Sequence, residues 1–141
     1  MAQKQDTEVL SKIIKAKYIS GAKKFITNNK SKKLLFISSG TPQIELKYIC
    51  NKKKISFFFD GIYGSPNNKN LHIKNIKKKW DLKNKEILFI GDSIIDLTAA
   101  SKFKLHFLAI GKDLIKHIKK NDYILDDLKF VNNVIKKIEN N

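Results

Sequence analysis

Two apolar runs constrain the fold of this chain most, because each is too short for a helix and each ends in small or polar residues. Residues 34–37 (Leu-Leu-Phe-Ile) precede Ser-Ser-Gly, and residues 87–90 (Ile-Leu-Phe-Ile) precede Gly-Asp-Ser. A strand that is apolar at every position has both of its faces covered, which is typical of parallel sheets in α/β proteins. The two runs therefore predict buried parallel strands at residues 33–37 and 86–90.

Helical and extended patterns alternate along the rest of the chain. Apolar residues at helical spacing predict helices, which we place at residues 8–17, 22–27, 41–51, 68–80, 93–103, 113–120 and 127–138. Shorter apolar runs predict strands at residues 57–63, 105–110 and 123–125. Thr41 and Pro42 have the residue types of a helix N-cap and of a first helical position. The alternation predicts an α/β fold, in which a Rossmann-like parallel sheet lies between two layers of helices.

The chain is strongly positive, and all of its basic residues are lysine. Its 141 residues have a formal net charge of +16, and its 29 basic residues include no arginine. Because arginine is the usual reader of phosphates and base edges, this composition disfavours a dedicated nucleic-acid-binding protein, and a positive field attracts small anionic substrates. No apolar run is long enough to span a membrane, and the first ten residues lack the pattern of a secretory signal. We expect a cytoplasmic protein with no membrane partner and, with Cys50 as its only cysteine, no disulfide.

Several conspicuous residues have a structural interpretation. The three histidines show no metal-ligand spacing, and His106 lies inside an apolar run, which favours a packed core residue. Trp80 and the three phenylalanines at residues 57–59 are expected to pack in the core or against helices.

Polar residues gather where the two buried strands end. Ser38, Ser39 and Gly40 follow the first strand, and Gly91, Asp92, Ser93 and Asp96 follow the second. In open parallel sheets, ligands bind beyond the carboxyl ends of the strands, and a helix that starts there presents N–H groups to a phosphate. The residues therefore favour an anion or metal site at this edge. The alternative, in which the serines only cap a helix and Asp92 only closes a turn, stays open on this reasoning alone.

Three segments together resemble a known family. FISSG, then YGSPNNK, then ILFIGDSIIDLTAA are similar, in order and spacing, to the second, third and fourth motifs of the haloacid dehalogenase-like hydrolase superfamily. The later segment NDYILDDL resembles the end of phosphoglycolate-phosphatase-like members. The resemblance runs from about residue 18 to the C-terminus. It implies a Rossmann-like core at residues 30–141, preceded at 1–29 by a helical lead-in that would be a remnant of the family's cap.

The resemblance also implies roles for individual residues. Ser38 would bond the transferring phosphoryl group, with the N–H groups of Ser39 and Gly40 beside it. Lys69 would neutralise the phosphate, so Ser38 and Lys69 are the expected catalytic residues. Asp92 would bind Mg²⁺, and Asp96, one helical turn later, would support the metal or its waters. Hard oxygen ligands and a positive side chain are what phosphoryl transfer requires.

One family motif has no match in the printed sequence. The first motif is an apolar strand that ends in Asp-x-Asp, and its first aspartate is the nucleophile. The segment FFFDG has Ile62 where the second carboxylate would stand, and Asp6-Thr7-Glu8 follows polar residues. The resemblance thus implies a core without its usual first strand and without most of its cap. The strands at 33–37 and 86–90 would pair directly, leave a gap, or accept a strand from another chain.

These inferences lead to one leading hypothesis and two alternatives. The leading hypothesis is a Mg²⁺-dependent phosphatase for a small phosphate monoester, incomplete in this chain, with a second chain as a candidate source of the first motif. The first alternative is a non-catalytic phosphate-binding or regulatory remnant. The second is a basic protein associated with nucleic acid.

Overall fold

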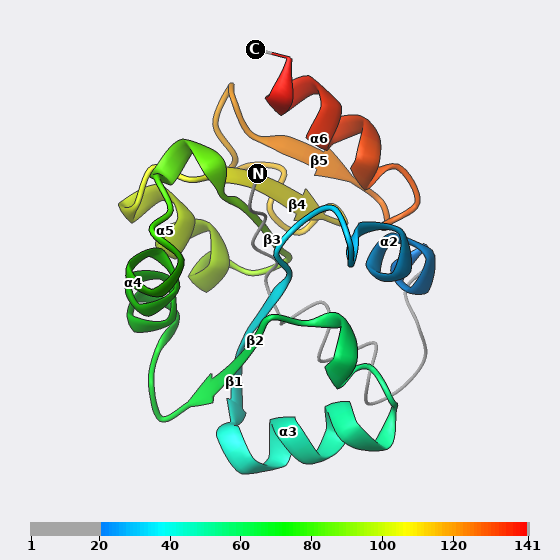
Figure 1. Ribbon diagram of the computed structural model, residues 1–141. Coiled ribbons are helices and arrows are strands. Elements are labelled where there is room, and N and C mark those ends of the chain that lie inside the picture. Colours follow the sequence, from blue (N-terminus) through cyan, green and yellow to red (C-terminus); the bar gives the residue numbers. More distant parts are fainter. Residues whose placement is uncertain (1–20, 141) are drawn as a thin grey trace.

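The computed structural model describes residues 21–140, and within them strands and helices alternate (Figure 1). The predicted helix at 8–17 and most of the lead-in at 1–29 lie outside the described residues. The helices are α2 (Ala22–Asn29), α3 (Gln43–Lys52), α4 (Lys69–Trp80), α5 (Ile94–Lys102) and α6 (Val131–Glu139). The strands are β1 (Phe36–Pro42), β2 (Gly61–Ser65), β3 (Leu88–Gly91), β4 (His106–Ile110) and β5 (Tyr123–Leu125). Two 3-10 turns, η1 (Ser56–Phe58) and η2 (Asn84–Glu86), precede β2 and β3.

All observed strand pairs are parallel, which confirms the predicted α/β class. Strand β1 pairs with β2, with Phe36 opposite Gly61, and β3, β4 and β5 form a second sheet in that order. Within residues 21–140, β1 and β3 belong to different sheets and do not pair with each other. Of the three arrangements expected for these strands, direct pairing is therefore not the one observed.

The core lies on both faces of the strands, as their continuous apolar character predicts. Leu88 and Ile90 of β3 pack in one cluster with residues of α2, α3 and α6, whereas Ile87 and Phe89 pack in another with α4 and α5. Successive strand residues point to opposite faces, so one strand serves both clusters. Figure 1 shows the same division, with α4 and α5 on one side of β3 and β4 and α2 on the other.

Four predicted elements differ from the structure, one of them the helix predicted at 127–138, which begins only at Val131. Strand β1 continues to Pro42, which pairs with Ser65, so α3 begins at Gln43 and not at residue 41. The predicted strand at 57–63 is η1 followed by β2, because the chain turns before Gly61. Residues 113–120 form turns and no helix. There the buried Leu114 packs into the second cluster, and short-range bonds such as His117 N–H to Leu114 O (2.8 Å) replace a helical ladder.

Trp80 and Phe59 follow the predictions, whereas Phe57 and His106 do not. Trp80 packs edge-on against Phe36, with ring centroids 4.7 Å apart, and Phe59 is buried. Phe57 is 75% exposed, so the expectation that it packs in the core or against helices was wrong. His106 is half-buried at the start of β4, where its Nε2 donates to Lys85 O at 3.1 Å, so the expectation that it is a packed core residue was wrong.

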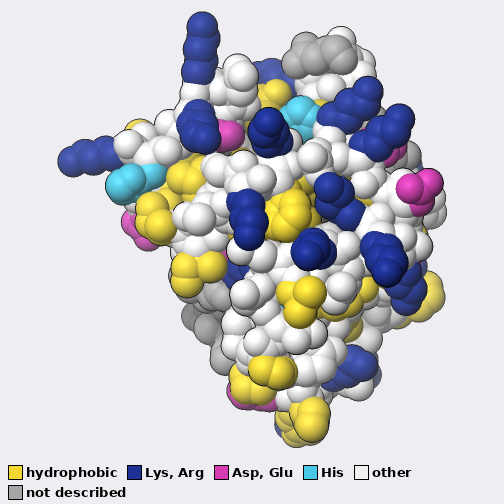
Figure 2. Space-filling view, turned by 90° about the vertical axis from the view of Figure 1, so that its left-hand side faces the viewer, with side chains coloured by type: hydrophobic (Ala, Val, Ile, Leu, Met, Phe, Trp, Pro, Cys, Tyr) yellow, Lys and Arg dark blue, Asp and Glu magenta, His cyan; other side chains and the backbone are white. Residues whose placement is uncertain are grey.

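Lysine side chains are scattered over the surface. Figure 2 shows them distributed across one face and interspersed with apolar side chains, with few carboxylates among them. None of the helices between residues 21 and 140 has the length and apolar character of a membrane-spanning segment.

Candidate functional site

The candidate site lies where β1, β2 and β3 end and where α4 and α5 begin. Capping fixes the start of both helices. The side chain of Asn68 accepts a hydrogen bond from Leu71 N–H (2.9 Å), which makes Lys69 the first residue of α4. At α5, Ser93 and Asp96 each accept a bond from the other's backbone N–H, which forms a capping box. Local sequence chemistry thus sets the position of Lys69 and of the Gly-Asp-Ser turn.

Lys69 and Asp96 form a buried ion pair that joins the third-motif and fourth-motif segments. Lys69 Nζ donates to Asp96 Oδ1, and the two side chains are 7% and 0% exposed. Asp96 Oδ2 accepts the N–H groups of Asp92 and Ser93, both at 3.1 Å. Both oxygens of Asp96 therefore have partners within the protein. This geometry gives Asp96 an orienting part, holding Lys69 on one side and the turn that carries Asp92 on the other.

The close approach of Asp96 to the end of β3 requires a glycine. A Cβ on Gly91 would lie 2.6 Å from both Cβ and Cγ of Asp96, closer than two carbon atoms can approach. The absence of a side chain at position 91 therefore allows the carboxylate to reach the backbone N–H groups of the turn.

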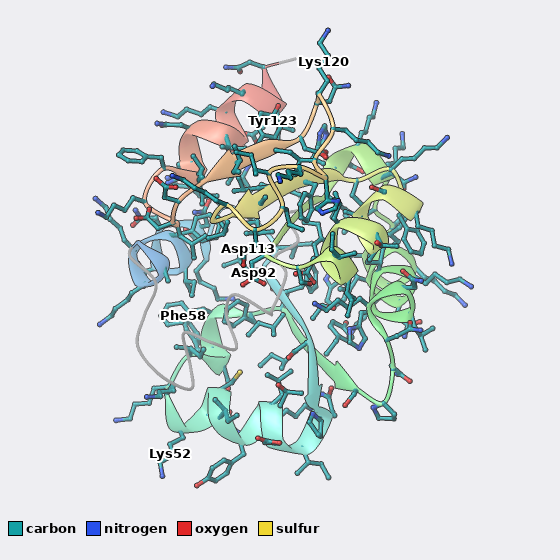
Figure 3. The ribbon with its side chains drawn as sticks, turned by 180° about the vertical axis from the view of Figure 1, so that it is seen from behind. Lys52, Phe58, Asp92, Asp113, Lys120 and Tyr123 are labelled. Atoms are coloured by element: carbon teal, nitrogen blue, oxygen red, sulfur yellow. The ribbon has the colours of Figure 1, made fainter. Side chains whose placement is uncertain are left out.

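Asp92 fits a magnesium ligand better than Asp96 does. It is half-buried beyond the end of β3 (labelled in Figure 3), and Asp96 fixes its backbone. Mg²⁺ is commonly bound through one or two carboxylates and keeps several waters. The Asp92 carboxylate, with Asp96 engaged by Lys69 and by the backbone of the turn, suits that chemistry. In the described part of the chain, no three His, Cys, Asp or Glu residues lie close enough to hold a metal by themselves.

The structure places Ser38 against α4. Its side chain is fully buried, and its Oγ lies 2.7 Å from Nδ1 of His72, which is also buried. The neighbouring Ser39 is directed differently, because its Oγ accepts the N–H of Thr41 (3.0 Å) at the turn into α3. The two serines that the sequence grouped together thus make separate contacts. Their expected roles toward phosphate, and that of Gly40, stay predictions.

Two residues that the sequence analysis missed hold the end of β2. His72 Nε2 donates to Gly64 O at 2.9 Å, and the Gln43 side chain accepts from Gly64 N–H while donating to Ile62 O at 2.9 Å. A Cβ on Gly64 would meet Thr41 O at 2.5 Å, so this contact also requires glycine. His72 was detectable in principle, because it follows Lys69 by three residues and so shares its helix face.

Cys50 is not a candidate nucleophile. It is fully buried in α3, and this burial raises the pKa of its thiol from 9.0 to about 11. A thiol, unlike a thiolate, is a poor nucleophile, so Cys50 is inert at neutral pH.

Comparison with known proteins identifies the family. The family model for haloacid dehalogenase-like hydrolases matches residues 2–110. The chain belongs to this family. No curated protein matches the sequence.

Solved structures of this family share the fold. A haloacid dehalogenase-like hydrolase from Streptococcus pneumoniae is 24% identical with a TM-score of 0.73, over 82% of this chain and 59% of its own. The core domain of a second protein, from Streptococcus pneumoniae TIGR4, is 14% identical with a TM-score of 0.74, over 96% of this chain and 95% of its own. YfnB from Bacillus subtilis, solved bound to magnesium, is 17% identical with a TM-score of 0.73, over 83% of this chain and 55% of its own. The chain thus spans 59% of the length of the first of these hydrolases.

Proposed function

We propose that this chain is the phosphate-binding core of a Mg²⁺-dependent phosphatase that acts on a small phosphate monoester. The observation that carries the proposal is the buried Lys69–Asp96 pair, because it brings the loop after β2 and the turn after β3 to one edge of the fold. Family membership supports hydrolysis, and the magnesium bound to YfnB supports the metal.

Each residue of the site has a defined task in this proposal. Lys69 places a positive charge where the phosphoryl group lies, and the N–H groups of Ser39 and Gly40 orient its oxygens. Asp92 is the ligand of Mg²⁺, which when bound would neutralise charge on the phosphoryl oxygens. Asp96 keeps Lys69 and the backbone of Asp92 in place through the bonds described above. Such pre-arranged charges are the main protein contribution to phosphoryl transfer.

The nucleophile is the part of this proposal that the described residues do not supply. The resemblance assigns it to an apolar strand that ends in Asp-x-Asp, and we propose that a second chain carries that strand. The purified chain alone should then show no Mg²⁺-dependent turnover of p-nitrophenyl phosphate above background. Turnover that disappears in Asp92→Ala would contradict this assignment of the nucleophile and point to a carboxylate within the chain.

Phosphate binding is the direct test of the site. Titration of the labelled chain with inorganic phosphate, followed by NMR, should shift the amide signals of Ser39, Gly40 and Lys69. Shifts that scatter over the exposed lysines of α4 would show diffuse charge attraction and overturn the proposed site. The same groups would serve a non-catalytic phosphate-binding protein. Adding the first-motif strand separates the two functions, because only the phosphatase gains turnover.

A further inference from the structure

We propose that His72 is a positioning residue for Lys69, and this inference rests on the proposed function. As a neutral imidazole protonated on Nε2, His72 fixes the end of β2 onto α4 and thereby sets where Lys69 lies. The geometry places a proton on Nε2. Gly64 O can only accept a hydrogen bond, so the Nε2 that lies 2.9 Å away carries the proton. In a neutral ring Nδ1 is then an acceptor, and the partner at 2.7 Å, Ser38 Oγ, donates to it.

The burial of these groups makes it costly to lose either of the two hydrogen bonds of the His72 ring. His72 and Ser38 are 1% and 0% exposed, so water does not replace a lost partner readily. A buried polar group without a partner carries a desolvation penalty, and this penalty favours the one arrangement in which both ring nitrogens are bonded. His72 therefore connects three elements at defined points: Ser38 of β1, Gly64 of β2 and its own helix, α4.

Lys69 depends on this connection because of its place in the chain. It lies three residues before His72 on α4, and both side chains are buried on the same face of the helix. Only four residues separate Gly64 from Lys69, so fixing Gly64 O to His72 fixes both ends of the loop that delivers Lys69. Asp96 holds the far end of the Lys69 side chain. The position of the ammonium group is thus set from both directions.

The bond to His72 also bears on Ser38. A hydroxyl has one proton, and in the proposed tautomer Ser38 gives that proton to Nδ1 of His72. With His72 neutral, Ser38 can accept a hydrogen bond but cannot donate one to a phosphoryl oxygen. We therefore assign Ser38 to the support of His72, and the contacts with phosphate to Lys69 and the amides after β1.

The experiment compares four variants of the full chain by NMR. His72→Leu removes both ring bonds, whereas His72→Gln retains an N–H group that can donate to Gly64 O. His106→Leu is the matched control, because His106 also donates to a carbonyl, Lys85 O, but lies at the start of β4. In the unmodified chain, the ring nitrogen signals of His72 should show a proton on Nε2, and Ser38→Ala should shift the Nδ1 signal.

The expected result separates positioning from general stability. His72→Leu should shift the amide signals of Gly64 and Lys69 and weaken phosphate binding about tenfold. His72→Gln should largely restore both the amide signals and the phosphate affinity, and His106→Leu should change neither of these two readouts. A proton on Nδ1, or unchanged Gly64 and Lys69 signals in His72→Leu, would overturn the inference. If the unmodified chain binds no phosphate while these signals respond as expected, the proposed function fails and the positioning role is supported.

Discussion

At the scale of single residues, the ion pairs of Lys69 and Lys129 show how burial determines the contribution of a charged side chain to stability. Lys69 and Asp96 are almost fully enclosed, so neither charge is compensated by water. Lys129 and Asp127 lie 3.9 Å apart on the surface, where the lysine is 55% exposed. Removing one partner of a buried pair leaves an isolated charge in the interior, whereas removing a surface partner leaves a hydrated one.

Asp96→Asn should therefore destabilise the fold by about 3–5 kcal/mol, because it removes a buried counter-charge of the Lys69 ammonium. Asp127→Asn, the matched exposed substitution, should change the free energy of unfolding by less than about 1 kcal/mol. Urea denaturation of the two variants measures both values. Equal, small effects would mean that the buried pair contributes no more than a surface pair.

Cys50 provides a second test at the scale of single residues, because it affects how the free energy of unfolding changes at alkaline pH. Its pKa is about 11 in the folded chain and 9.0 in the unfolded one, because burial disfavours the thiolate. The folded state therefore retains the thiol proton to a higher pH than the unfolded state does. The contribution of Cys50 to the free energy of unfolding is fully present below pH 9. It is lost between pH 9 and 11, with a slope of up to about 1.4 kcal/mol per pH unit. Cys50→Ala should be less stable at pH 8 but should show a flatter decline over that range, as measured by denaturation at each pH.

At the scale of elements, the site depends on turns that approach a side chain or a second backbone closely. The turn from β3 into α5 passes against Asp96, and the end of β2 passes against Thr41 and Gln43. Gly111, which follows β4, is different: its φ of +85° requires glycine for conformational reasons, but its Cβ position is open. Substitutions at these two kinds of glycine should therefore have different effects on the structure.

Gly91→Ala should displace the Asp96 side chain and cost about 1–3 kcal/mol, because neither the helix nor the strand can move away without losing packing. Gly111→Ala should cost roughly 1–2 kcal/mol through backbone strain alone. The readout that distinguishes them is NMR of the site: Gly91→Ala should shift the Lys69 and Asp92 signals, and Gly111→Ala should not. If both variants leave these signals unchanged, the close packing of Asp96 on Gly91 has no part in ordering the site.

For the whole molecule, the main feature is that two strands buried on both faces lie in different sheets. Leu35 and Ile37 of the β1 segment and Leu88 and Ile90 of β3 pack in the same apolar cluster, yet β1 pairs with β2 and β3 with β4. Strands share backbone hydrogen bonds only when they lie about 4.8 Å apart. We therefore expect one further parallel strand to complete the sheet between β1 and β3.

A peptide or protein with an apolar strand that ends in Asp-x-Asp should raise the melting temperature of the chain, because a ligand that binds only the folded state stabilises it by mass action. Without it we expect a marginally stable or self-associating chain. A scrambled peptide of the same composition is the control. A monomer that melts cooperatively at an ordinary mesophile temperature, with no response to either peptide, would show that the chain is self-sufficient.

Local sequence chemistry was sufficient for much of this fold. Helices α4 and α5 were predicted from their apolar spacing, because helical periodicity involves residues three or four apart. Strands β3, β4 and β5 were recognisable, within one or two residues, because a buried strand is apolar throughout. The placement of Asp92 directly after a buried strand follows from the same local signals, whereas Lys69 was singled out only by the family resemblance.

Contacts between distant residues decided the rest. The Lys69–Asp96 pair joins positions 27 apart, and Ser38 meets His72 across 34 residues, so no local pattern could reveal either. The helix predicted at 113–120 has suitable spacing, but packing of Leu114 into the core favours turns there. The partner of each strand is equally non-local. Apolar patterning fixes which residues are buried, whereas only the assembled tertiary structure fixes which buried groups lie next to one another.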